Sequence, residues 1–261
     1  MPEAAEPLVR GDVDRGIATI TLDSPHNRNA LSARLRTELA QELAAAVADD
    51  TVRAVVLTGT GPVFCAGADL KEIAAERAGQ DPDPHAPGMP DLFSAIMDAP
   101  KPVVARLNGP ARAGGIGLVA AADIAVAPAS ATFAFTEVRI GVVPAIISVP
   151  VSARMHDRQL SRYFLTGEAF DAGAAAEAGL LTCAVPDDEV GAVTERILDG
   201  LRQCAPRALN RTKALLNESG YRERKAAFAD MGELSREFFG GDDAAEGRAA
   251  FFEKRPPRWA L

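Results

Sequence analysis

Residues Lys101 to Glu137 read KPVVARLNGPARAGGIGLVAAADIAVAPASATFAFTE, and the rest of the chain is organised around this segment. It begins with an apolar, β-branched run, Pro102 to Leu107, which is typical of a buried strand. A turn follows at 108–110, and Gly114-Gly115-Ile116-Gly117 then leads into an alanine-rich helix. Such a junction points backbone N–H groups and the positive end of a helix dipole at one spot. By itself it fits a phosphate site, an oxyanion site or a plain turn.

A second junction of the same kind lies upstream. The apolar strand Ala54 to Thr58 leads into FCAGADLKE, Phe64 to Glu72, where small residues precede a helix start. Two such loops can aim their N–H groups at one carbonyl oxygen, which is the geometry of an oxyanion hole. The strands expected after the first junction, 124–126 and 132–135, lead directly to Glu137, so a carboxylate follows the same region.

Six segments carry a resemblance to a known family. FCAGADLKE, KPVVARLNGPARAGG, ADIAVA and FAFTEVRIGVVP, in this order, resemble the enoyl-CoA hydratase/isomerase (crotonase) family, as do NRNAL at 27–31 and FFEKRPP at 251–257. The resemblance implies an α/β fold, with a crotonase-like spiral core of ββα turns over residues 1–195. It also implies an all-helical region, 196–261, that assembles homotrimers or hexamers built as dimers of trimers. The implied partner is an acyl-CoA thioester, and no cofactor is implied because coenzyme A is part of the substrate.

Charge, cysteine spacing and the lack of long apolar runs argue against several classes of protein. The net charge of −8, from 28 basic and 36 acidic residues, argues against binding to nucleic acid or to an anionic membrane. The cysteines, Cys65, Cys183 and Cys204, are too widely spaced to suggest disulfides or a zinc site. The start, MPEAAEPLVR, lacks the apolar run of a signal peptide, and no run is long enough to span a membrane. We therefore expect a cytoplasmic protein without a bound metal.

Hydrophobic periodicity predicts the other elements. Residues 8–13 and 16–22 form a hairpin pattern, and Ser32 suits the N-cap of a helix whose leucines lie four residues apart. The segment 77–90, rich in proline, glycine and acids, predicts a mobile loop that either covers the site or remains a plain surface loop. From residue 188 onward the pattern is helical, over 188–203, 206–217, about 221–239 and 243–254.

The resemblance assigns roles to residues of both loops. It makes the N–H groups of Ala68 and Gly114 the two donors of the oxyanion hole, and one such donor is worth about 3 kcal/mol. Ala30 and Ala66 would contact the adenine of coenzyme A through their main chains. Asp69 fits a helix cap as well as a ligand contact, and each lysine fits a solvated charge as well as a phosphate contact. The side-chain candidates for coenzyme binding are Arg28, Asp69, Lys71 and Lys254.

The acid–base groups depart from the family pattern. Family hydratases use two glutamates, and here the first position is Gly117 while the second is Glu137. A single carboxylate can move a proton at the α-carbon if apolar neighbours raise its pKa from about 4.3 toward neutrality. The group that activates water stays open among Asp69, Glu72, Ser148 and Glu137 itself.

Arg112 stands where the family commonly has an aliphatic residue. It fits a structural arginine, a contact to a coenzyme phosphate, or a partner for a carboxylate on the acyl group. The segments GGIGLVAAADIA, TEVRIGVVPAIIS and SRYFLTGEAFDA are similar to bacterial methylglutaconyl-CoA and isohexenylglutaconyl-CoA hydratases. Those proteins also carry glycine in place of the first glutamate, and their substrates bear a carboxylate, which favours the third role.

The sequence thus predicts a hydratase that adds water across the 2,3 double bond of an acyl-CoA thioester, with a branched or carboxylated acyl group as one option. Two alternatives remain open. One is a Δ3,Δ2-enoyl-CoA isomerase that uses Glu137 as its sole acid and base. The other is a non-catalytic acyl-CoA-binding protein.

Overall fold

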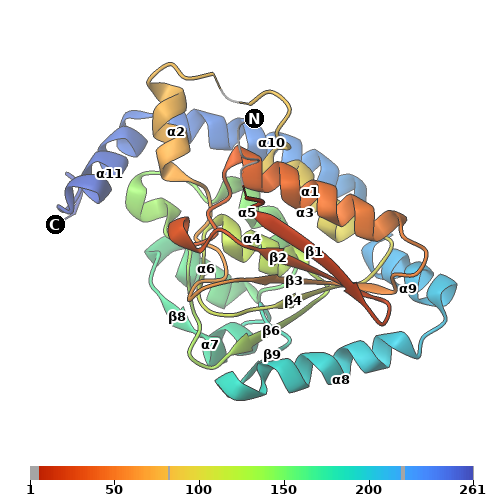
Figure 1. Ribbon diagram of the computed structural model, residues 1–261. Coiled ribbons are helices and arrows are strands. Elements are labelled where there is room, and N and C mark those ends of the chain that lie inside the picture. The colour runs from red at the N-terminus through yellow and green to blue at the C-terminus, as the bar shows by residue number, and fades with distance from the viewer. Residues whose placement is uncertain (1–5, 82, 219–220, 261) are drawn as a thin grey trace.

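The computed structural model describes residues 6–81, 83–218 and 221–260, and in this part of the chain two sheets are surrounded by helices (Figure 1). The larger sheet has the strand order β1-β2-β3-β4-β6-β9, with β1 antiparallel to β2 and the later neighbours parallel. Its strands are β1 (Val9–Asp14), β2 (Ile17–Leu22), β3 (Ala54–Gly59), β4 (Val103–Arg106), β6 (Ile124–Pro128) and β9 (Cys183–Val185). The smaller sheet joins β5 (Ala111–Arg112), β7 (Thr132–Ala134) and β8 (Phe170–Asp171).

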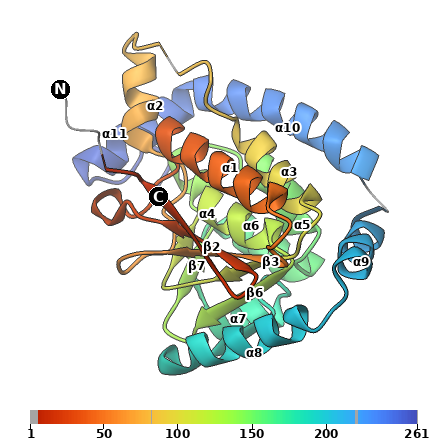
Figure 2. The ribbon, with the colours of Figure 1, turned by 45° about the vertical axis from the view of Figure 1, so that its right-hand side comes forward.

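The larger sheet lies between two layers of helix, which is why its parallel strands are apolar throughout. Helix α1 (Ala33–Ala48) buries Leu35, Leu39 and Leu43 on one face of the sheet. On the other face α8 (Val190–Arg202) places Leu198 in a second apolar cluster with residues of β2, β3 and β4. Figures 1 and 2 show α1 and α8 on opposite sides of the strands.

Helix α4 (Gly114–Ala121) lies at the centre of the molecule, and all of its residues are buried. Around it lie α3 (Met89–Asp98) and α5 (Ala145–Ser152), which both pack against it. The remaining helices are α2 (Leu70–Arg77), α6 (Asp157–Thr166), α7 (Ala172–Glu177) and the 3-10 helices η1 (Pro25–Asn27), η2 (Glu137–Ile140) and η3 (Asp187–Glu189).

The C-terminal helices α9 (Pro206–Glu218), α10 (Tyr221–Gly240) and α11 (Asp242–Glu253) pack on the core of their own chain. From α9, the buried Lys213 pairs with Asp123 at 2.7 Å and donates to the carbonyl oxygens of Ile96 and Lys101, both at 3.1 Å. Helix α10 lies along α5 and α3 (Figure 2). Helix α11 packs on η2, where a Cβ on Gly247 would come within 2.6 Å of the Cα of Ile140.

The α/β class and the helical C-terminal region predicted from the sequence are confirmed. The expected boundary at residue 195 falls inside α8, which packs against the larger sheet. The loop expected over 77–90 is shorter, because α2 includes Arg77 and α3 begins at Met89. Among the described helices, none is both long and apolar enough to cross a membrane.

Candidate active site

The two small-residue loops identified in the sequence meet in space. Gly67 has a φ of +88°, and a Cβ there would lie 2.9 Å from the Cβ of Ala113 and 3.0 Å from the nitrogen of Gly114. The loop is also held from its other side, where the N–H of Leu31 donates to the Gly67 carbonyl at 2.8 Å. Only glycine permits this approach, so Ala68 comes close to the N-terminus of α4.

The two predicted donors, Ala68 and Gly114, have backbone N–H groups without an acceptor in the described structure. Gly114 begins α4, and the first N–H groups of a helix have no acceptor within it. Within the described residues, neither the Ala68 N–H nor the Gly114 N–H donates to a protein oxygen. If both N–H groups face one point, an oxygen atom there would accept two hydrogen bonds beside the positive end of the α4 dipole, and this role for the pair stays a prediction.

Asn29 fastens the first loop and was not identified from the sequence. It is fully buried with a φ of +54°, and its amide donates to the carbonyl oxygens of Thr60, Val63 and Phe64 at 2.9 to 3.1 Å. The Cys65 thiol donates to the Asn29 carbonyl at 3.1 Å, and burial raises the pKa of this thiol to about 12. The sequence clue was an asparagine in a polar loop, since this residue tolerates positive φ.

Glu137 reaches the same region through the smaller sheet. Strand β5 pairs with β7, and the N–H of Ala113 donates to the Ala134 carbonyl at 3.2 Å, three residues before Glu137. The Glu137 side chain is only 8% exposed, and its Oε2 atom has no hydrogen-bond partner. Burial raises the pKa of this carboxyl group to about 7, so it can both accept and return a proton near neutrality.

The position of the first family glutamate is filled by an aromatic ring. A Cβ on Gly117 would lie 2.9 Å from Cε2 of Phe93 and closer still to Cζ. One turn earlier on α3, the Met89 methyl carbon would lie 2.5 Å from a Cβ on Gly114. Helix α3 therefore forms an apolar wall over the first two turns of α4, and Glu137 faces no second carboxylate from residue 117.

The other residues considered for water activation are engaged elsewhere. The Asp69 carboxylate accepts from the N–H groups of Lys71 and Glu72 and so caps α2. The Glu72 carboxylate accepts from the N–H of Ala33 at 2.9 and 3.0 Å, at the start of α1. The Ser148 hydroxyl donates to a carbonyl within its own helix. Glu137 is thus the candidate whose carboxylate oxygen is left without a partner.

Arg112 is half-buried between the strands of the smaller sheet. Its guanidinium donates to the carbonyl oxygens of Ala111 and Thr132 and to the Thr132 hydroxyl. Burial lowers its pKa from the ordinary value. These contacts fasten β5 to β7 beside the hole, and a role for Arg112 in binding a substrate carboxylate stays a prediction.

The residues expected to contact coenzyme A lie in three places. Ala30 is buried, Arg28 is exposed, and the N–H of Ala66 donates to the Arg28 carbonyl at 3.0 Å, so these three lie together beside the hole. Lys71 is exposed on α2, and Lys254 is exposed at the C-cap of α11. Their contacts to coenzyme A stay predictions. Among the described side chains, no group of three or more His, Cys, Asp or Glu could hold a metal ion.

Comparison with known proteins identifies relatives along the whole chain. A family model described as "Enoyl-CoA hydratase/isomerase" matches residues 12–260. The crystal structure of an enoyl-CoA hydratase from Mycobacterium avium is 42% identical, with a TM-score of 0.87 over 98% of this chain and 100% of that one. A carnitinyl-CoA hydratase structure from the same species is 29% identical, with a TM-score of 0.83 over 98% of this chain and 99% of that one. The 2,3-dehydroadipyl-CoA hydratase of Escherichia coli (strain K12) is 30% identical over 242 residues, 92% of this chain and 94% of that protein. The crotonase-like fold expected from the sequence is confirmed.

Proposed function

The chain belongs to the enoyl-CoA hydratase/isomerase family, and from this we propose that it adds water across the 2,3 double bond of an acyl-CoA thioester. One observation carries the proposal. The N–H groups of Ala68 and Gly114 have no acceptor in the described structure, and the loops that carry them pack together. Burial in the neighbouring segment raises the pKa of the Glu137 carboxyl group to about 7. This combination suits a reaction that builds negative charge on a carbonyl oxygen and moves protons at neutral pH.

The proposed mechanism uses one carboxylate twice. The Glu137 carboxylate takes a proton from water while the water oxygen bonds to C3, and the π electrons move onto the thioester oxygen. Ala68 and Gly114 donate to that oxygen in the enolate, each worth about 3 kcal/mol. The Glu137 carboxyl group then protonates C2 and the thioester carbonyl re-forms, so both elements of water arrive from one side.

A Δ3,Δ2-enoyl-CoA isomerase is the second candidate, and the Phe93 ring over Gly117 favours it. Isomerisation needs only one proton shuttle. The Glu137 carboxylate would remove a proton from C2 of a 3-enoyl thioester and return it to C4 as the double bond moves to the 2,3 position. The same oxyanion hole would hold the intermediate.

A non-catalytic acyl-CoA-binding protein is the candidate of another class. It would need the two donors but no carboxyl group with a pKa near neutrality, so Glu137 argues against it.

We further propose that the chain forms a homotrimer or a dimer of trimers, acts in the cytoplasm and needs no cofactor. Support for the assembly comes from the family and from apolar side chains left exposed on α9, Leu215 and Leu216.

The acyl group is proposed to be branched or carboxylated. One relative is named for an unsaturated dicarboxylic thioester, 2,3-dehydroadipyl-CoA, which makes a carboxylated acyl group a reasonable first choice. Arg112 would bind the carboxylate if it kept one N–H free of Thr132. An Arg112→Ala variant whose preference for carboxylated over plain enoyl-CoA is unchanged would exclude this role.

The first experiment is product analysis by mass and chromatography. The purified protein is incubated separately with crotonyl-CoA, 3-methylglutaconyl-CoA and a 3-enoyl-CoA. Gain of one water, slowed about 10² to 10⁴-fold in Glu137→Gln, supports the hydratase. Double-bond migration without a change in mass supports the isomerase, and binding without any product supports the non-catalytic protein.

A further inference from the structure

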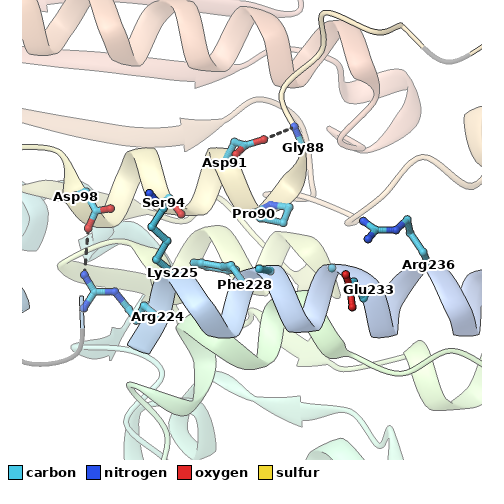
Figure 3. Close-up of a pocket in the computed structure, with 12 residues that line it drawn as sticks. Gly88, Pro90, Asp91, Ser94, Asp98, Arg224, Lys225, Phe228, Glu233 and Arg236 are labelled. Atoms are coloured by element: carbon cyan, nitrogen blue, oxygen red, sulfur yellow. Dashed lines mark hydrogen bonds and ion pairs between the residues drawn. The ribbon is translucent and has the colours of Figure 1, made fainter. Parts of the chain in front are cut away.

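A groove of about 630 Å³ lies between α3 and α10 (Figure 3). The two helices run in opposite directions along it, because Asp98 of α3 pairs with Arg224 of α10 at 3.1 Å while the start of α3 lies toward the C-terminal half of α10. Six of the twelve lining residues are charged, and the buried ring of Phe228 lies between them. The groove is therefore a polar channel with an apolar patch in its wall.

The groove begins one side chain away from the oxyanion hole. Gly88 and Pro90 line its end, and the residue between them, Met89, places its methyl group against Gly114. An acyl group whose carbonyl sits between Ala68 and Gly114 would meet Met89 first and the groove next. Methionine is unbranched and changes rotamer readily, so it can form a movable partition.

Some charged side chains that line the groove have partners in the described structure and others do not. Asp98 is paired with Arg224, and the Asp91 carboxylate accepts from the Gly88 N–H at 3.1 Å. Lys225 and Arg236 make no hydrogen bond or ion pair with any described residue. Figure 3 shows both cations on the α10 side of the groove, with Lys225 reaching toward Ser94.

These cations disfavour an alkyl chain in the groove. A methyl end that displaced water from Lys225 or Arg236 would return no hydrogen bond, whereas a carboxylate would replace the lost water with charge-assisted bonds. Two lining carboxylates without a cationic partner in the described structure, those of Glu233 and Asp91, oppose an anion.

We propose that this groove receives the far end of the acyl group and that Lys225 and Arg236 select thioesters ending in a carboxylate. The inference rests on the proposed function and deepens it by naming the substrate class. It assigns carboxylate recognition to residues without other partners, whereas Arg112 already donates to Thr132. Lys225 and Arg236 are eleven residues apart, about 16 Å along a helix, so the two cations serve acyl groups of different length.

The test measures binding by calorimetry, without turnover. Saturated acyl-CoAs of six, eight and twelve carbons are compared in matched pairs that end in a carboxylate or a methyl group. Contacts to coenzyme A are the same within a pair and cancel. At one or more lengths the carboxylate form binds about five- to tenfold more tightly, and this preference falls as salt rises.

Variants of the lining residues test whether the preference for the carboxylate form depends on the groove. The double variant Lys225→Ala/Arg236→Ala loses the preference, because the carboxylate form binds more weakly while the methyl-ended form binds equally well or more tightly. Glu233→Gln strengthens binding of the carboxylate form. Both cations are exposed, so these changes leave the fold intact, and Arg207→Ala on the exposed face of α9 is the matched control. Equal affinity within every pair, or a preference that survives the double variant, overturns the inference. Absence of turnover with every enoyl-CoA, with the binding preference intact, overturns the proposed function instead.

Discussion

At the scale of single residues, the environment of Glu137 sets the chemistry. Its neighbours in the chain, Phe133 and Phe135, are fully buried, and its own Oε2 atom lacks a partner. The sequence predicts that apolar surroundings raise the pKa of this carboxyl group, and its burial in the structure raises the pKa to about 7. A protein tolerates such a buried group at a cost in stability, which is typical of a functional position.

This cost depends on pH and can be measured. The pKa of Glu137 is about 7 when folded and near 4.5 when unfolded, so the folded state holds the proton more tightly. The free energy of unfolding therefore falls as pH rises from about 4.5 to 7. We expect Glu137→Gln to gain about 2 kcal/mol more at pH 8 than at pH 5 in denaturant unfolding. The exposed Glu237→Gln on α10 should show no such difference, and equal gains for Glu137→Gln at both pH values would contradict the assignment.

At the scale of elements, the packing of α3 on α4 leaves no room for a side chain at residue 117. The Phe93 ring occupies the space into which a side chain at residue 117 would extend. A larger residue at 117 would therefore overlap the Phe93 ring, and a smaller residue at 93 would leave a cavity beside Gly117.

The overlap at residue 117 should lower the free energy of unfolding, which thermal or denaturant unfolding of single variants can measure. Gly117→Ala should lose about 1 to 3 kcal/mol of stability, because its Cβ would overlap the Phe93 ring. Gly191→Ala in α8, where nothing lies within 4 Å of the new Cβ, should gain roughly 0.5 to 1 kcal/mol. In a Phe93→Ala background the penalty at 117 should disappear, and its persistence there would show that the ring is not its cause.

Substitutions at residues 93 and 117 can also test whether a second carboxylate would speed hydration. Phe93→Ala opens a space beside α4, and Gly117→Glu in that background supplies a group that can hold and activate water. We expect the hydration rate of crotonyl-CoA to rise about tenfold or more over Phe93→Ala alone, since general acid–base groups commonly contribute 10² or more. A folded double variant with no such gain would show that residue 117 is not positioned to assist.

At the scale of the whole molecule, the C-terminal helix α11 packs beside the segment of its own chain that carries Glu137. Helix α11 packs on η2, and the backbone of Asp243 and Ala244 closely approaches Gly141. Glu137 lies at the start of η2, so its burial depends in part on a helix about a hundred residues later in the chain.

Displacing α11 from η2 should thus lower the pKa of the Glu137 carboxyl group. Gly247→Ala places a Cβ within 2.6 Å of the Ile140 Cα and pushes the helix away from η2. Water then reaches the carboxyl group and its pKa falls from about 7 toward 4.5, so the acid limb of the kcat/KM profile moves to lower pH. Gly240→Ala, with nothing within 4 Å, is the control. An unchanged profile in Gly247→Ala would mean that α11 does not protect Glu137.

The sequence pattern did not predict helix α5 or strand β5, and each has a physical reason. Helix α5 is apolar on most sides and contains Pro150, so it shows no helical period. Strand β5 has only two residues and exists through its pairing with β7. By contrast β4 and the C-terminal helices follow their expected ranges within a few residues, because long periodic or apolar runs specify their own structure.

The family can be recognised from short ordered segments of the sequence, and the same segments predict the two donor loops and the single carboxylate. Three contacts appear only in the folded chain: the Phe93 ring fills the space at Gly117, Arg112 donates to Thr132, and α11 packs on η2. Each of these contacts joins residues far apart in the chain. A local pattern records which face of an element is apolar, but it does not record which distant side chain will pack there.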